Sequence, residues 1–205
     1  MIAVEDTVLV LLAAGQSERF GAAGNKLDEE FLGKPLGLHV AVALEDMPFK
    51  ERIVVVDGCR LDYAAHGFRV VTNPDPDEGM GSSVRLGIDC ARARGAAAVL
   101  IALADMPRVT AAHIYRLFDA SRDADTVVAS SDGVAPRPPV LFGRDQFEAL
   151  MNVSGDAGAR DLVQTGRHVV TTPAELIDID TRADLEELRA LVHAPERTIT
   201  RPHAD

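Results

Sequence analysis

Four apolar runs, separated by amphipathic segments, constrain the fold of this chain more than any other feature of its sequence. They occupy residues 8–13, 53–56, 68–72 and 97–104. Runs that lack an alternation of apolar and polar residues fit strands covered on both faces. Helical patterns lie between the runs, at residues 36–44 behind Pro35, at residues 82–93, and after Thr110, which can cap a helix. Alternating strands and helices predict an α/β fold with a parallel sheet and helices on both faces.

The second half of the chain is less regular. We expect a final helix that begins with a capping box of Thr181 and Asp184. The other expected elements are strands at residues 126–130, 140–142, 168–172 and 176–179 and helices at residues 145–151 and 157–164. A chain of 205 residues suits one domain. We place this domain at residues 1–192 and expect a flexible tail at residues 193–205, which contain two prolines and no periodicity.

The composition argues against several classes of function. A net charge of −11 disfavours binding to nucleic acids or anionic membranes, because both require a basic surface. Cys59 and Cys90 have neither a metal-binding nor a redox spacing. No apolar stretch approaches the roughly 18 residues of a membrane-spanning helix. The first six residues lack the basic region of a secretory signal. We therefore expect a cytoplasmic protein.

The first apolar run ends at Gly15, and the loop behind it carries Arg19 and Lys26. Backbone N–H groups of a glycine-rich turn can converge on anionic oxygens, and cations add charge-assisted bonds to phosphate. Open α/β sheets bind ligands at the carboxyl ends of their strands. The order of strand, glycine, Arg and Lys therefore predicts a nucleoside triphosphate site. A loop that binds nothing is the alternative, and the dinucleotide and P-loop patterns are both missing.

Asp105 follows the fourth apolar run, so we expect it at the same sheet edge as Gly15. A carboxylate there suits Mg²⁺, which takes one or two carboxylates together with phosphate oxygens. Taken alone, a turn-forming Asp is the simpler interpretation. Opposite a phosphate-binding loop, the metal interpretation is preferred. Asp178 and Asp180 would lie on the same side of an expected strand, and one of them would complete the metal site.

Two further groups of residues are candidates for substrate recognition. Glycines and serines in residues 78–85, EGMGSSVR, open a helix whose N–H groups and dipole suit ribose hydroxyls or a phosphate. Ser82 as a helix cap and Arg85 as a surface cation are equally open interpretations. Asp156 and Arg160 in the sequence GDAGAR either recognise the second substrate or serve as a helix cap and a solvated residue.

Five motifs resemble, in order, those of the molybdenum-cofactor cytidylyltransferases, within the nucleotidyltransferases that act on molybdopterin, sugars and isoprenoid precursors. The motifs are LAAGQSERFGAAGNKL, NPDPDEGMGSSVRLG, ADMPRVT, GDAGAR and DIDTRADL. The resemblance implies a Rossmann-like three-layer sandwich with a mostly parallel sheet, as in nucleotide-diphospho-sugar transferases. It implies Mg²⁺-dependent transfer of a nucleoside monophosphate to a phosphate-bearing small molecule, with release of pyrophosphate. The LAAG form is similar to members that use CTP, and a molybdoenzyme or maturation protein is an implied partner.

The resemblance also implies roles for individual residues. The catalytic candidates are Arg19, Lys26 and Asp105, the metal candidates Asp105, Asp178 and Asp180, and the acceptor-binding candidates Arg85, Asp156 and Arg160. The nucleotide-binding candidates are Leu12, Ala13, Ala14, Gly15, Ser17, Arg19, Lys26, Asn73, Gly81, Ser82, Ser83 and Asp105. Pro138 departs from the family, because it stands where many members have the histidine of a Gly-His-Pro run. The departure motivates two alternatives: a sugar or isoprenoid phosphate as acceptor, or a non-catalytic carrier of a nucleotide or pterin.

Overall fold

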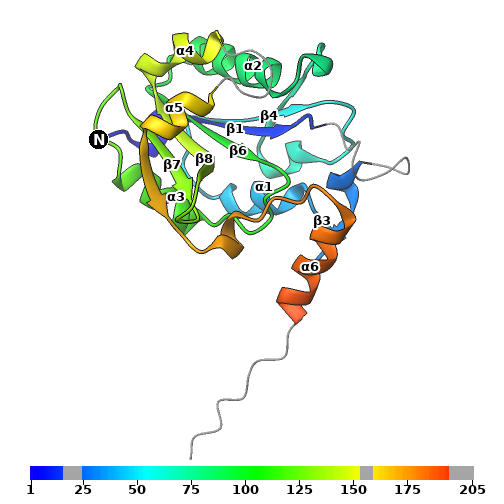
Figure 1. Ribbon diagram of the computed structural model, residues 1–205. Coiled ribbons are helices and arrows are strands. Elements are labelled where there is room, and N and C mark those ends of the chain that lie inside the picture. The colour runs from blue at the N-terminus through cyan, green and yellow to red at the C-terminus, as the bar shows by residue number, and fades with distance from the viewer. Residues whose placement is uncertain (16–24, 153–158, 194–205) are drawn as a thin grey trace, which may run out of the picture.

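The computed structural model describes residues 1–15, 25–152 and 159–193 (Figure 1). Its centre is a seven-stranded sheet in the order β5-β4-β1-β6-β8-β7-β9. The strands are β1 (Thr7–Ala13), β4 (Glu51–Val56), β5 (Arg69–Thr72), β6 (Ala98–Leu103), β7 (Val127–Ser131), β8 (Pro136–Gly143) and β9 (Arg167–Val170). All strand pairs are parallel except those of β8, which runs antiparallel to β6 and β7. The mostly parallel sheet predicted from the sequence is therefore confirmed.

Helices cover both faces of this sheet. The helices are α1 (Leu38–Leu44), α2 (Met80–Ala93), α3 (Ala111–Asp119), α4 (Phe147–Met151), α5 (Arg160–Thr165) and α6 (Arg182–His193). Figure 1 shows α2, α4 and α5 on one face and α1 and α3 on the other. Alternate side chains of β1 point to opposite faces of the sheet, and each set belongs to one of two hydrophobic cores. Leu9 and Leu11 pack with α1 and α3, whereas Val8 and Val10 pack with α2 and α4. Among the described helices, none is long and apolar enough to cross a membrane.

Short 3-10 helices connect several of these elements. They are η1 (Val4–Asp6), η3 (Lys26–Asp28), η4 (Tyr63–His66), η5 (Pro76–Glu78), η6 (Arg144–Gln146) and η7 (Pro173–Leu176). Helix α2 lies very close to β1 because Gly87 faces Val10, where a Cβ atom would stand 2.5 Å from the valine Cγ1. This close approach places the first turn of α2 beside the end of β1.

A small third cluster lies at one end of the molecule. A hairpin of β2 (Glu30–Phe31) and β3 (Lys34–Pro35) packs against α6, which projects from the end of the sheet in Figure 1. The buried side chains of this cluster are Phe31, Leu36, Ile179, Leu185 and Leu188. The cluster joins the segment after Lys26 to the segment before α6, although about 150 residues of chain separate them.

The structure corrects two of the expected elements. The helix expected at residues 36–44 begins only at Leu38, because Pro35 belongs to strand β3. The strand expected at residues 176–179 is absent from this described part of the chain: Leu176 ends η7 and residues 177–180 have no regular structure. The apolar residues of this segment are buried for another reason than strand pairing: Leu176 packs in the main core and Ile179 in the third cluster. Asp178 and Asp180 therefore do not share a strand face.

The remaining expected elements are confirmed, with shifted bounds. Strand β8 is longer than the expected 140–142 and includes three prolines. The prolines are compatible with the sheet because the β7–β8 register shifts between Ala129 and Ser130, so Pro138 and Pro139 fall at the irregularity. The first residues of the helix expected at 157–164 lie outside the described residues.

Candidate active site

A pocket of about 500 Å³ opens at the carboxyl ends of β1 and β6. Its lining residues are Leu12, Ala13, Ala14, Gly15, Lys26, Leu27, Pro76, Asp77, Gly79, Met80, Ser83, Leu103 and Asp105. The end of β1 forms one wall, and the first turn of α2 forms another. Gly79 has a φ of 80°, which glycine adopts readily, and it turns the chain from η5 into α2. The pocket lies at the sheet edge where the sequence predicts a ligand site, and ligand binding there stays a prediction.

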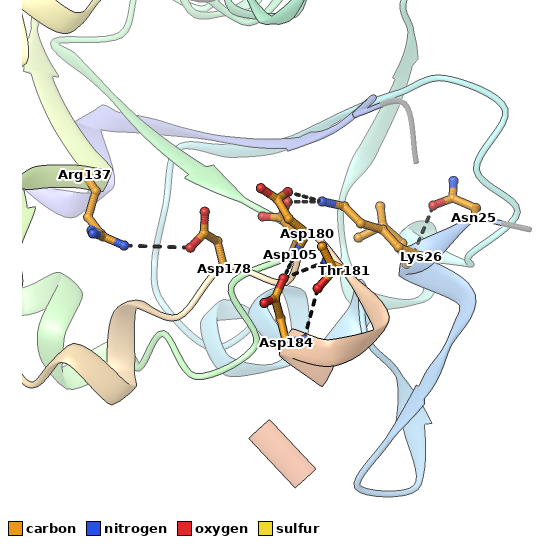
Figure 2. Close-up of polar contacts among 9 residues, drawn as sticks. Asn25, Lys26, Asp105, Arg137, Asp178, Asp180, Thr181 and Asp184 are labelled. Carbon is orange, nitrogen blue, oxygen red and sulfur yellow. Dashed lines mark hydrogen bonds and ion pairs between the residues drawn. The ribbon is translucent and has the colours of Figure 1, made fainter. Parts of the chain in front are cut away.

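Lys26 and Asp105 face each other at this pocket. The Lys26 Nζ donates to Asp105 Oδ2 at 2.7 Å and to Asp180 Oδ1 at 3.1 Å (Figure 2). Only 8% of the Lys26 side chain and 19% of the Asp105 side chain are exposed. Lys26 begins η3, and the Asn25 side chain caps that turn by accepting from Leu27 N–H. The ion pair is therefore held between an ordered turn and the end of β6.

The environment shifts the pKa of both partners upward. Burial disfavours the charged ammonium of Lys26, but the attraction of Asp105 and Asp180 outweighs burial and raises its pKa. Burial raises the pKa of Asp105, Lys26 opposes this effect, and the charges of Asp178 and Asp180 add to it. The site thus brings one amino group close to several carboxyl groups, and the most buried of these is Asp105.

Asp178 and Asp180 point in different directions from the segment before α6. Asp180 reaches Lys26, whereas Asp178 faces Arg137, with 3.7 Å between Asp178 Oδ1 and a terminal guanidinium nitrogen (Figure 2). The Asp184 side chain accepts from the backbone N–H of Asp180 at 3.0 Å and of Thr181 at 2.7 Å. Asp184 N–H in turn contacts Thr181 Oγ1 at 3.2 Å, so the predicted capping box is present.

Asn73, Ser82 and Ser83 connect the end of β5 to the start of α2. The Asn73 amide donates to Ser82 Oγ at 2.8 Å and to Ser83 Oγ at 3.0 Å, and all three residues are buried. Ser82 Oγ also donates to the Gly79 carbonyl at 2.9 Å. Of these three residues only Ser83 lines the pocket; Asn73 and Ser82 lie behind its wall and fix the position of α2.

The other predicted residues are distributed as follows. Gly81 is buried in the first turn of α2, and Arg85 on the same helix pairs with Glu78 at 2.5 Å. Arg160 is exposed at the start of α5 and is not among the residues that line the described pocket. Ser17, Arg19 and Asp156 lie outside the described residues.

Sequence reasoning missed several residues of the site. Pro76, Asp77 and Met80 line the pocket, and their position beside Gly79 in the second motif was a usable signal. Arg137 had no such signal, because only the antiparallel return of β8 brings it to this edge. The described charged side chains of the lining are Lys26, Asp77 and Asp105, so this part of the pocket is not positive overall.

The carboxylates could coordinate a divalent cation, with oxygens of a substrate as its remaining ligands. Asp105 Oδ1 is buried and has no hydrogen-bond partner in the described structure, although its other oxygen binds Lys26. Asp180 shares Lys26 with Asp105, which places a second carboxylate at the same point. No group of three or more potential ligand side chains exists among the described residues. Such a sparse set suits Mg²⁺, which is commonly held by one or two carboxylates and substrate phosphates.

The chain is similar in sequence and in fold to known proteins. The chain is 30% identical over 199 residues to the purine catabolism protein PucB of Bacillus subtilis, covering 88% of this chain and 94% of that protein. It is 32% identical over 171 residues to the phosphoenolpyruvate guanylyltransferase of Sphaerobacter thermophilus, covering 77% of each. The crystal structure of Rv0371c from Mycobacterium tuberculosis matches with a TM-score of 0.73 at 25% identity, covering 91% of this chain and 99% of that one.

A second structure of Rv0371c is a complex with manganese; it matches with a TM-score of 0.67 at 25% identity, over 89% of this chain and 97% of that one. The profile of the MobA-like NTP transferase domain matches residues 9–171, which include most of β1, the Lys26–Asp105 pair and all of the described pocket lining. The chain therefore belongs to the MobA-like NTP transferase family and is a nucleotidyltransferase.

Proposed function

We propose that this enzyme transfers CMP from CTP to a phosphate-bearing acceptor, such as molybdopterin, and releases pyrophosphate. One observation carries the proposal: the Lys26 ammonium and the Asp105 carboxylate meet in a pocket at the ends of two buried parallel strands. An ammonium in that position can bind phosphate oxygens, and the carboxylate can hold a divalent cation beside them. The LAAG sequence at residues 12–15, part of the pocket lining, supports CTP as the donor.

We assign the donor nucleotide to the wall formed by the end of β1 and the start of α2. Leu12 and the small residues Ala13, Ala14 and Gly15 offer apolar surface and backbone groups to the base and ribose. Ser83 offers a hydroxyl at the first turn of α2, where the helix dipole favours a phosphate. Asn73, Gly81 and Ser82 support that turn. In the same proposal Ser17 and Arg19 bind the triphosphate.

We assign a Mg²⁺ ion to Asp105, through its unpartnered Oδ1, and to Asp180. Asp178 is the less favoured second ligand, because its carboxylate is turned toward Arg137. When bound, the cation offsets negative charge on the phosphates. The manganese complex of Rv0371c supports a divalent cation in a protein of this fold.

The reaction joins two anions, and the residues of the site reduce their repulsion. An oxygen of the acceptor phosphate attacks the α-phosphorus of the nucleotide, and the bond to the β-phosphate bridging oxygen breaks as pyrophosphate leaves with the bonding electrons. Two like charges 4 Å apart repel by about 1 kcal/mol in water and about 4 kcal/mol at a dielectric constant near 20. Lys26 lowers that repulsion by binding triphosphate oxygens, and the rigid pocket walls hold the reactants in line.

A pyrophosphate-release assay tests the proposal. The purified protein is incubated with CTP, GTP or ATP, Mg²⁺ and molybdopterin, with parallel reactions that lack the acceptor. We expect release of pyrophosphate with CTP that depends on both the acceptor and the metal. Tight binding of CTP in calorimetry without turnover would instead favour a non-catalytic carrier and contradict the proposal.

A second candidate is guanylyl transfer to a different small anion. The relative named phosphoenolpyruvate guanylyltransferase is 32% identical over 77% of this chain. This similarity is the reason to test GTP and phosphoenolpyruvate as substrates. GTP with phosphoenolpyruvate is therefore a separate arm of the same assay. If only this arm shows turnover, the enzyme is still a nucleotidyltransferase, but its donor is GTP and its acceptor is phosphoenolpyruvate. In either case Arg85, Asp156 and Arg160 are proposed to contact the acceptor.

A further inference from the structure

Arg137 lies at the edge of the sheet that carries the pocket, on the opposite side of Asp105 from Lys26 (Figure 2). Strand β8 runs antiparallel to β6, so its first residues lie where β1 and β6 end. Arg137 is the second residue of β8 and pairs in register with Ser130 of β7. In Figure 2, Arg137 and Lys26 stand on opposite sides of the carboxylates of Asp105, Asp178 and Asp180.

The guanidinium of Arg137 is held firmly on one side and loosely on the other. Its Nη2 contacts Asp132 Oδ2 at 2.9 Å, and Asp132 is itself fixed because its Oδ1 accepts from the backbone N–H of Val134 and Ala135. The contact with Asp178 is 3.7 Å, beyond hydrogen-bond range, and half of the Asp178 side chain is exposed. Asp132 thus orients the guanidinium, whereas Asp178 can move aside into water.

The guanidinium also has hydrogen-bonding capacity that the described structure does not use. Its Nε is buried and has no hydrogen-bond partner among the described residues. An arginine presents five N–H donors in a planar fork that matches two oxygens of a phosphate. About a third of the Arg137 side chain is exposed, so a ligand can reach it.

The charge distribution calls for a cation on this side. An acceptor phosphate must approach Asp105, Asp178 and Asp180, which are all carboxylates, and Lys26 lies on the far side of them. We infer that Arg137 binds the phosphate of the acceptor, displacing Asp178, and so forms the acceptor subsite opposite Lys26. This inference rests on the proposed phosphate-bearing acceptor.

Steady-state kinetics with three variants test the inference. We expect Arg137→Gln to raise the KM for the acceptor at least about 10-fold, which corresponds to about 1.4 kcal/mol, while the KM for CTP is unchanged. Arg137→Lys should restore part of the loss, because it keeps the charge but not the fork. The matched control is Arg92→Gln, which removes another surface ion pair, with Glu148, remote from the pocket; it should change neither constant. An unchanged acceptor KM in Arg137→Gln, or an equal rise in both KM values, would overturn the inference.

A binding experiment separates failure of this inference from failure of the proposed function. The probe is inorganic phosphate, titrated into ¹⁵N-labelled protein with and without CTP and Mg²⁺. We expect the Arg137 Nε–H resonance, identified by its absence in Arg137→Lys, to shift with phosphate. No shift in a protein that binds CTP would overturn the inference and leave the proposed function standing. A protein that does not bind CTP would contradict the proposed function, and the phosphate titration alone would then decide whether Arg137 is an anion site.

Discussion

Asp105 is largely buried, with 19% of its side chain exposed. One carboxylate oxygen binds the ammonium, and the other is buried without a described partner. A buried charge is costly unless it is paired and hydrogen-bonded, and such groups concentrate at functional sites. The half-satisfied carboxylate therefore supports the proposed metal-binding role of Asp105 more than a contribution to stability.

Removal of either partner should abolish most of the activity. We expect Lys26→Ala and Asp105→Ala each to reduce kcat at least about a hundredfold, because each removes preorganised charge from the transition state. Pyrophosphate release measures the effect, and circular dichroism checks that the fold persists. Lys50→Ala and Asp119→Ala are matched controls at exposed positions outside the pocket. Near wild-type turnover in Lys26→Ala or in Asp105→Ala would reject the role of that residue.

His113 makes the stability of the fold depend on pH. Its Nε2 contacts Ser130 Oγ at 2.7 Å and only 1% of the residue is exposed, so burial lowers its pKa below the usual 6.5 despite the attraction of Glu175. As pH falls through 6.5 the unfolded chain takes up the proton first, and stability is lost below that pH. We expect a loss of at most about 1.4 kcal/mol per pH unit in wild type and a smaller loss in His113→Gln. Urea unfolding on both sides of pH 6.5 measures the difference, and equal losses would contradict it.

At the scale of elements, the segment before α6 contributes both to packing and to the candidate site: Ile179 is buried in the third cluster, and Asp180 contacts Lys26. The capping box of Thr181 and Asp184 could be predicted because it depends on local spacing. The nearby strand at residues 176–179 was wrongly predicted, because Pro173 begins a 3-10 turn and Ile179 packs against α6 instead of pairing in a sheet. Short apolar segments are ambiguous in this way until their tertiary partners are known.

Asp184 should stabilise both α6 and the position of Asp180. Its carboxylate accepts two backbone N–H groups. Burial raises the pKa of Asp184, but the hydrogen bonds from Thr181 and Asp180 together outweigh burial and lower it. We expect Asp184→Ala to reduce the free energy of unfolding by about 1 kcal/mol, the usual cost of losing an N-terminal cap. The control is Glu187→Ala, which removes an exposed carboxylate from the same helix. Equal effects of the two substitutions in urea unfolding would contradict the capping role.

At the scale of the whole molecule, the sheet order decides which residues meet. The order of apolar runs and helical patterns was sufficient to predict the parallel strands β1, β4, β5 and β6 and the shared edge of Gly15 and Asp105. The meeting of Arg137 with Asp178 could not be predicted, because it depends on the antiparallel insertion of β8 between β6 and β7. Non-local pairing of this kind leaves no local pattern in the sequence.

The overall charge of −11 also shapes the site. The described lining of the pocket carries Lys26 against Asp77 and Asp105, and Asp180 stands beside them. A triphosphate therefore meets a site whose described side chains are acidic in balance. We therefore expect nucleotide binding to depend on a divalent cation, which would offset the negative charges of both the carboxylates and the triphosphate.

A crystal structure with Mn²⁺ and a non-hydrolysable CTP analogue tests this central claim most directly. The account predicts an anomalous manganese peak at coordination distance from Asp105 Oδ1, with the triphosphate in the pocket and in contact with Lys26. A nucleotide bound elsewhere, with no manganese at Asp105 and the Lys26–Asp105 pair unaltered, would contradict it.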